Sequence, residues 1–156
     1  MKKQLIFGHI ATLLVGGLIY LLFRTSSLKM FGWYKTIGLG EFTNGLRKLT
    51  IPFADKIPDW ILFSLPDGLW IFSYVSLVLF IWNNSISKSN LFWILIIPTL
   101  AICSEIGQLL GFVPGVFDVT DLLLYLLGMT LPFILFNRPI DLVHKIVNRL
   151  RSSHFS

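Results

Sequence analysis

Residues 104–121 read SEIGQLLGFVPGVFDVTD, which sets polar side chains into the apolar C-terminal half of the chain. Glu105 and Gln108 are three residues apart, and so are Asp118 and Asp121. Residues at this spacing share one face of a helix. The Pro-Gly step between the two pairs indicates a tight reversal of the chain. The stretch therefore predicts two helices that meet at a short turn, with polar groups close to it.

The composition is typical of a membrane protein. The 156 residues are 54% hydrophobic, 15% aromatic and only 13% charged, with a mean hydropathy of +0.75, whereas soluble domains average about 25% charged residues. The net charge of +5 favours membrane lipids with anionic headgroups as partners, and nucleic acid is not expected. The single cysteine, Cys103, excludes an internal disulfide.

The apolar runs predict an all-α, polytopic fold in a single membrane domain over residues 1–156. A run of 19 apolar residues at about 1.5 Å per residue is long enough to cross a hydrocarbon core of about 30 Å. Four such runs predict a bundle of four transmembrane helices, at about residues 5–23, 66–82, 91–111 and 118–136.

Two further segments are predicted to lie on the membrane rather than in it. Residues 24–65 mix charges with aromatic residues, which predicts an interfacial loop region of short helices and turns. Residues 140–151 place apolar residues on one helical face with lysine and arginine around them, which predicts a C-terminal basic amphipathic helix.

The distribution of basic residues suggests an orientation. Four spans put both termini on one side, together with Lys2, Lys3, Lys88, Arg138, Lys145, Arg149 and Arg151. The opposite side has Arg24, Lys29, Lys35, Arg47, Lys48 and Lys56, diluted through the long loop. The positive-inside rule therefore favours both termini in the cytoplasm.

The same span count gathers six polar residues towards the opposite face of the membrane. Ionisable residues within spans face the bundle interior and are candidates for a binding site. The candidate pocket residues are Arg24, Asp67, Glu105, Gln108, Asp118 and Asp121.

Structural roles compete with this interpretation. Asp118 could equally be the N-cap of the last span. Arg24 could form a structural ion pair with Glu105 or Asp121, which is as good an explanation as a substrate site.

No catalytic residue can be assigned, and an enzyme is the less favoured hypothesis. His9 lies at the far end of span one from the acidic residues, which argues against a His-dependent hydrolase, and zinc lacks Cys and His ligands at useful spacing. No resident cofactor or metal is expected. Mg²⁺ on Asp118 and Asp121, with Asp67 and Glu105 nearby, is the weaker alternative.

These residues resemble the VanZ-like family of small bacterial membrane proteins, known for resistance to teicoplanin and lipoglycopeptides. That family ends a span with Glu-x-x-Gln and opens the next with Asp-x-x-Asp followed by a glycine seven residues on. The matching residues here are Glu105, Gln108, Asp118, Asp121 and Gly128, and the resemblance extends to Arg24 and to residues 65–70, LPDGLW. Many members have an arginine and an asparagine where this chain has Gly115 and Tyr125.

The resemblance implies a multi-pass protein of the bacterial cytoplasmic (inner) membrane that acts in the cell envelope. The first functional hypothesis is a non-enzymatic protein whose one-sided polar pocket binds a lipid headgroup, a lipid-linked envelope precursor or a membrane partner, and so affects susceptibility to glycopeptide or lipopeptide antibiotics. The second is a metal-assisted enzyme that acts on a lipid or polyprenyl phosphate, with Glu105 as general base. The third is a structural subunit of a membrane complex.

Overall fold

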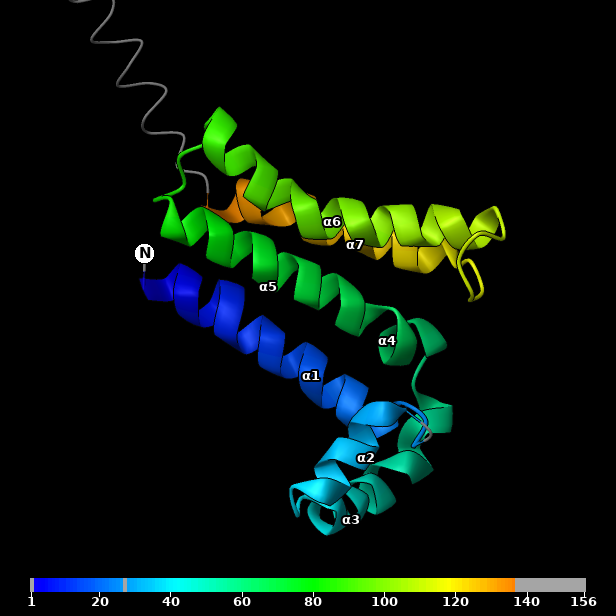
Figure 1. Cartoon of the computed structure of the whole chain (residues 1–156). Coiled ribbons are helices and arrows are strands. Elements are labelled where there is room, and N and C mark those ends of the chain that lie inside the picture. Colours follow the sequence, from blue (N-terminus) through cyan, green and yellow to red (C-terminus); the bar gives the residue numbers. More distant parts are fainter. Residues whose placement is uncertain (1, 27, 137–156) are drawn as a thin grey trace, which may run out of the picture.

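The computed structural model describes residues 2–26 and 28–136, and within them every regular element is a helix (Figure 1). The predicted amphipathic helix at residues 140–151 lies outside the described residues. In chain order the elements are η1 (Gln4–Ala11, a π-helix), α1 (Thr12–Phe23), α2 (Lys29–Thr36), α3 (Gly40–Thr50), η2 (Ile51–Lys56, a 3₁₀-helix), α4 (Asp59–Phe63), α5 (Leu65–Ile81), α6 (Lys88–Leu109) and α7 (Val119–Phe136).

Three of the described helices are long and apolar enough to cross a membrane: Gln4–Phe23, which joins η1 to α1, Lys88–Leu109 and Val119–Phe136. The predicted all-helical class is confirmed, and the three helices are compatible with the predicted membrane protein. The predicted second span corresponds to α5, which is apolar but shorter, at 17 residues. Pro66 occupies its first turn, where a missing backbone N–H leaves no hydrogen bond unmade.

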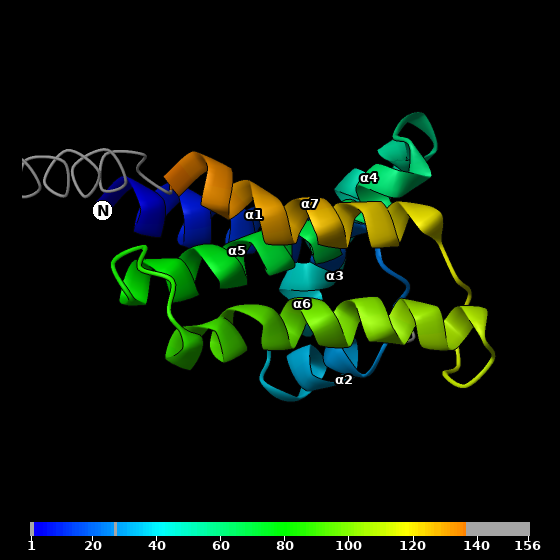
Figure 2. The ribbon, with the colours of Figure 1, turned by 90° about the horizontal axis from the view of Figure 1, so that it is seen from above.

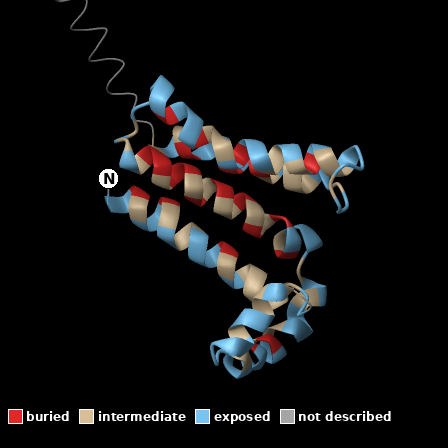
Figure 3. Cartoon of the chain, in the orientation of Figure 1, coloured by how far each residue is buried: buried red, intermediate tan, exposed pale blue. Residues whose placement is uncertain are grey.

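Helix α5 is the centre of the bundle. It packs against η1 and α1 and against α6 and α7. In Figure 1 it lies between α1 and the pair α6 and α7, and in Figure 2, seen from above, it lies between α6 and α7. More of the described buried residues lie on α5 than on any other helix, and Figure 3 shows them in red. The apolar core is made by Ile71, Val75, Val78, Leu79, Ile94 and Tyr125.

Glycines allow α5 to approach its neighbours closely. A Cβ built at Gly128 would overlap the carbonyl oxygen of Gly68, so α5 and α7 meet backbone to backbone. A Cβ at Gly16 would lie 2.9 Å from the indole nitrogen of Trp70, whereas Gly17 has nothing within 4 Å. Close approach through small residues is a common way for membrane helices to associate.

The segment 24–65 is folded rather than extended. Helices α2 and α3 form a helical hairpin that projects sideways from the end of α1, away from α6 and α7 (Figure 1). Arg47 of α3 is only 7% exposed and donates to the carbonyl of Leu21 at 2.8 Å. The hairpin is thereby attached to the last turn of α1, whose free carbonyls attract a cation.

Candidate functional site

The up-and-down order of α1, α5, α6 and α7 brings the predicted site residues to one end of the bundle (Figure 1). Arg24 follows the last residue of α1, Asp67 lies in the first turn of α5, Glu105 and Gln108 lie in the last turns of α6, and Asp118 and Asp121 lie at the start of α7. The polar cluster, as defined here, consists of Arg24, Asp67, Glu105, Asp121 and Tyr125.

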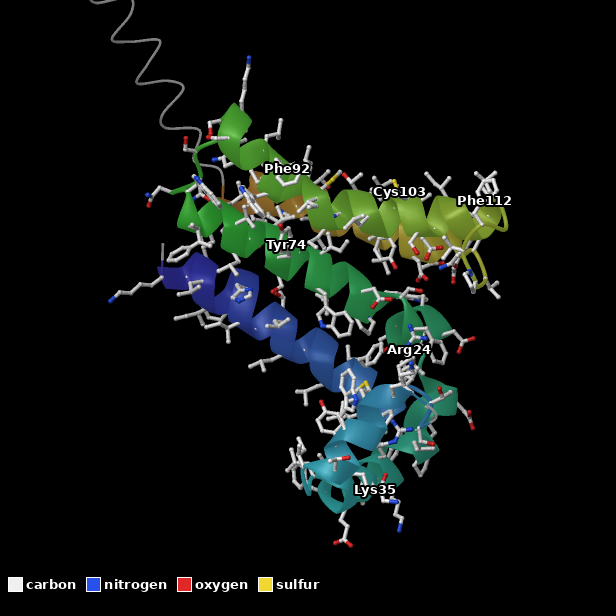
Figure 4. The ribbon with its side chains drawn as sticks, viewed as in Figure 1. Arg24, Lys35, Tyr74, Phe92, Cys103 and Phe112 are labelled. Carbon is white, nitrogen blue, oxygen red and sulfur yellow. The ribbon has the colours of Figure 1, made fainter. Side chains whose placement is uncertain are left out.

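Arg24 is held by several weak contacts and one ion pair (Figure 4). Its Nη2 lies 3.8 Å from Asp67 Oδ2 and donates to the carbonyl of Phe63 at 3.3 Å. The guanidinium also lies 5.2 Å from the ring centroid of Tyr20 and 5.4 Å from that of Phe63. Its Nε is buried and has no hydrogen-bond partner among the described residues. The ion pair therefore forms with Asp67, in place of the Glu105 or Asp121 partner considered from the sequence.

Glu105 is 3% exposed, the most buried carboxylate of the described segments. Its Oε2 accepts a hydrogen bond of 3.3 Å from the backbone N–H of Asp118. The side chain thus connects the end of α6 to the residue that precedes α7. A buried carboxylate that receives one neutral donor remains under-satisfied, because an ionised carboxylate can accept about four hydrogen bonds.

The side chain of Gln108 packs against Gly115 in the turn between α6 and α7. A Cβ at Gly115 would lie 2.7 Å from Gln108 Cδ, and Gly115 has a φ of +146°. This conformation is open to glycine and strained for any other residue. The arginine that many VanZ-like proteins have at this position is therefore not compatible with the turn as it is folded here.

The two aspartates of α7 differ in their surroundings. Asp118 is exposed, and its Oδ1 accepts a 2.7 Å hydrogen bond from the N–H of Thr120, which is the geometry of an N-cap. Asp121 lies one turn further in, where its charge interacts with those of Asp67 and Glu105. Its Oδ1 is buried without a hydrogen-bond partner among the described residues.

Tyr125 is a member of the cluster that was not predicted as a site residue. It is 9% exposed and lies within electrostatic range of Asp67, Asp121 and Glu105. The spacing contained a signal, because Tyr125 follows Asp121 by four residues and so shares its face of α7. From the sequence alone, Tyr125 is only a departure from the family pattern, because it stands where many VanZ-like proteins have an asparagine.

No group of three or more His, Cys, Asp or Glu side chains is placed to hold a metal ion in residues 2–26 and 28–136. The four-carboxylate magnesium site considered from the sequence is therefore not assembled there, and Asp118 and Asp121 face different surroundings. His9 lies away from the cluster, with its Nδ1 2.8 Å from the hydroxyl of Ser73 in mid-α5.

Comparison with protein-family models, with curated proteins and with solved structures gave no match. The resemblance to the VanZ-like family therefore depends on the residues quoted above.

Proposed function

We propose that the chain is a four-span membrane protein that binds the polar headgroup of a lipid or lipid-linked envelope precursor at the polar cluster, and does not catalyse a reaction there. In this proposal α5 is the second of the four spans, in addition to the three helices that are long enough by themselves. Both termini lie on the cytoplasmic side, so the cluster faces outward, in the setting of the VanZ-like proteins that its residues resemble.

One observation carries the proposal: the cluster leaves both a buried acceptor, Asp121 Oδ1, and a buried donor, Arg24 Nε, without a hydrogen-bond partner in the described segments. Buried polar groups in folded proteins are almost always satisfied, and each exception calls for an explanation. A charged group left unpaired at a membrane face is costlier still. We propose that a bound headgroup supplies the missing partners.

The chemistry of the cluster limits the ligand. Asp121 and Glu105 offer acceptors, so the ligand must present donors such as sugar hydroxyls or an ammonium group. Arg24 offers a guanidinium N–H, which suits a phosphate oxygen. A headgroup that combines a phosphate with hydroxyl or ammonium donors fits both requirements.

The test is lipid retention by the purified full chain. Native mass spectrometry of protein extracted from membranes that contain phosphatidylglycerol, phosphatidylethanolamine and polyprenyl-linked sugars would identify what remains bound. We expect Glu105→Gln and Asp121→Asn to lower retention of the bound species about tenfold, the size of one charge-assisted hydrogen bond. Asp59→Asn is the matched control, because Asp59 is an exposed carboxylate in the first turn of α4.

The same preparation separates the alternatives. Equal retention by the control and both cluster variants would contradict the binding proposal. Turnover of a polyprenyl phosphate that is abolished by EDTA would favour the metal-assisted enzyme. Co-purification of a stoichiometric membrane protein, lost in both variants, would favour a subunit of a complex.

A further inference from the structure

The hairpin of α2 and α3 contains a cleft that is separate from the polar cluster. It has a volume of about 620 Å³ and is lined by Ser26, Phe31, Gly32, Lys35, Gly38, Gly40, Glu41, Thr43 and Asn44. It lies between two helices that project from the bundle, and Lys35 marks their outer end, remote from Arg24 (Figure 4). Its occupant would therefore approach from beside α1 and not from the cluster.

The cleft has one charge of each sign on its walls. Lys35 contributes an ammonium and Glu41 a carboxylate, and neither forms an ion pair with any residue in the described segments. Opposite charges that line one cavity without pairing can each contact a different part of a ligand. Asn44 and Ser26 add uncharged donors and acceptors on the same walls.

One wall of the cleft is held in place by the membrane helix. The guanidinium of Arg47 lies 4.6 Å from the ring centroid of Phe31 and donates to Leu21 of α1. Burial lowers the pKa of Arg47, but a guanidinium remains charged at neutral pH. Phe31 is therefore fixed between the cleft and a buried cation, so the site is organised before a ligand arrives.

The surroundings of the cleft are unusually apolar for a segment outside the bundle. Trp33 is 69% exposed and Phe42 65% exposed, and Ile37, Leu49, Phe53 and Trp60 are exposed nearby along the chain. Aromatic side chains are favoured at the level of lipid headgroups. A hairpin that extends sideways from the end of a membrane helix, with such a surface, lies in the interfacial region of the leaflet.

We propose that the cleft between α2 and α3 binds the headgroup of a phospholipid from the surrounding leaflet, with preference for a phosphate joined to a primary ammonium. Lys35 contacts the phosphate, Glu41 contacts the ammonium, and the acyl chains extend along the exposed apolar residues of the hairpin. This site is independent of the function proposed for the polar cluster.

The glycines of the hairpin provide a matched pair of variants. Gly32 and Gly45 both lie inside helices, and a Cβ at either would have nothing within 4 Å, but only Gly32 lines the cleft. Leucine at either position improves helix propensity, so neither change is expected to unfold the hairpin. Gly32→Leu places a bulky side chain on the wall of the cleft and Gly45→Leu does not.

The experiment measures lipids retained by the purified full chain from vesicles of equal phosphatidylethanolamine and phosphatidylglycerol, by native mass spectrometry. Every protein in the series carries Asp121→Asn, so that lipid bound at the polar cluster does not mask the cleft. We expect phosphatidylethanolamine to be retained preferentially and Gly32→Leu to lower that retention about tenfold relative to Gly45→Leu, as for the loss of one charge-assisted hydrogen bond. Lys35→Gln should lower retention of both lipids. Glu41→Gln should remove the preference for phosphatidylethanolamine and leave phosphatidylglycerol unchanged.

Two outcomes would overturn the proposal. Equal retention by Gly32→Leu and Gly45→Leu would show that the cleft holds no lipid. Binding of soluble phosphoethanolamine with the same dependence on Gly32, Lys35 and Glu41 would assign the cleft to a free ligand in place of a lipid. Failure of the polar-cluster variants Glu105→Gln and Asp121→Asn to affect retention would leave this site untouched.

Discussion

The two ends of the bundle both contain buried polar groups, but they satisfy them differently. At the end that holds Gln4 and Asn84, the two amides exchange hydrogen bonds of 2.8 and 3.0 Å, and Gln4 also donates to the carbonyl of Ser76 at 3.1 Å. At the other end, the polar cluster contains three carboxylates and one guanidinium, and Arg24 Nε and Asp121 Oδ1 have no hydrogen-bond partner in the described part of the chain.

The difference teaches how to separate structural polar groups from functional ones. Uncharged amides that saturate one another stabilise a junction between helices and leave nothing for a ligand. Charged groups that remain unpaired cost stability, which a folded protein tolerates where the groups have another use. The hydroxyl of Ser76 is the exception at the amide end, because it is buried without a partner in the described segments, but a neutral hydroxyl costs less than a charge.

The largest effect on the free energy of unfolding is expected at the backbone contact between α5 and α7, where Gly68 meets Gly128. Gly128→Ala would force the α5 and α7 backbones apart at Gly68, so we expect a loss of about 3 kcal/mol in the free energy of unfolding, as for severe overpacking. Gly17→Ala is the control, since Gly17 has open space. Unfolding in detergent, followed by circular dichroism, gives both values, and equal stability of the two variants would contradict the backbone contact.

The second-largest effect on stability is expected at the end of the bundle where Gln4 and Asn84 exchange hydrogen bonds. Gln4→Leu should cost about 2 kcal/mol, because it leaves Asn84 Oδ1 and the carbonyl of Ser76 without their donor and Asn84 Nδ2 without its acceptor. The variant should retain lipid at the polar cluster as the wild-type chain does. Stability is measured by the same unfolding assay, and loss of lipid retention without loss of stability would reverse the roles assigned to the two ends.

Arg24→Met should have a smaller effect on stability. Methionine can keep the apolar contacts with the Tyr20 and Phe63 rings, so the change removes chiefly the ion pair with Asp67. Both partners are partly exposed, and screening reduces the cost to about 1.5 kcal/mol or less. Lipid retention should fall more than stability does. A fall in stability with full retention would make Arg24 a purely structural residue.

The sequence predicted the parts of the fold that follow from local pattern. Hydropathy located the apolar helices to within a few residues, because a helix that crosses lipid must be apolar along its whole length. The position of Glu105 near a helix end also followed directly, since a carboxylate in an apolar run is costly unless it faces the bundle. Helix geometry and the hydropathy of the sequence were sufficient to predict both the helix positions and the place of Glu105.

The remaining features depend on contacts between distant residues. The ion pair of Arg24 with Asp67 depends on the packing of α1 against α5, where Gly16 lies close to Trp70. The π-helical geometry of Gln4–Ala11 has no signature in the hydropathy, and it lies where Gln4 bonds Asn84, 80 residues away. Composition indicated that residues 24–65 contain short helices, but not that Arg47 attaches them to α1.

The smallest expected effect concerns Asp118, which belongs to the acidic pattern by sequence and to the helix start by geometry. Its carboxylate accepts from the N–H of Thr120, so Asp118→Ala should cost about 1 kcal/mol, whereas Asp118→Asn should change stability by only a few tenths, because asparagine caps helices as well as aspartate does. Neither variant removes the backbone N–H that Glu105 accepts. If Asp118→Asn keeps full stability but loses lipid, the charge of Asp118 contacts the ligand and the polar cluster extends to the exposed end of α7. If it keeps both, Asp121 Oδ1 and Arg24 Nε, which have no hydrogen-bond partner in the described segments, are sufficient to define the site.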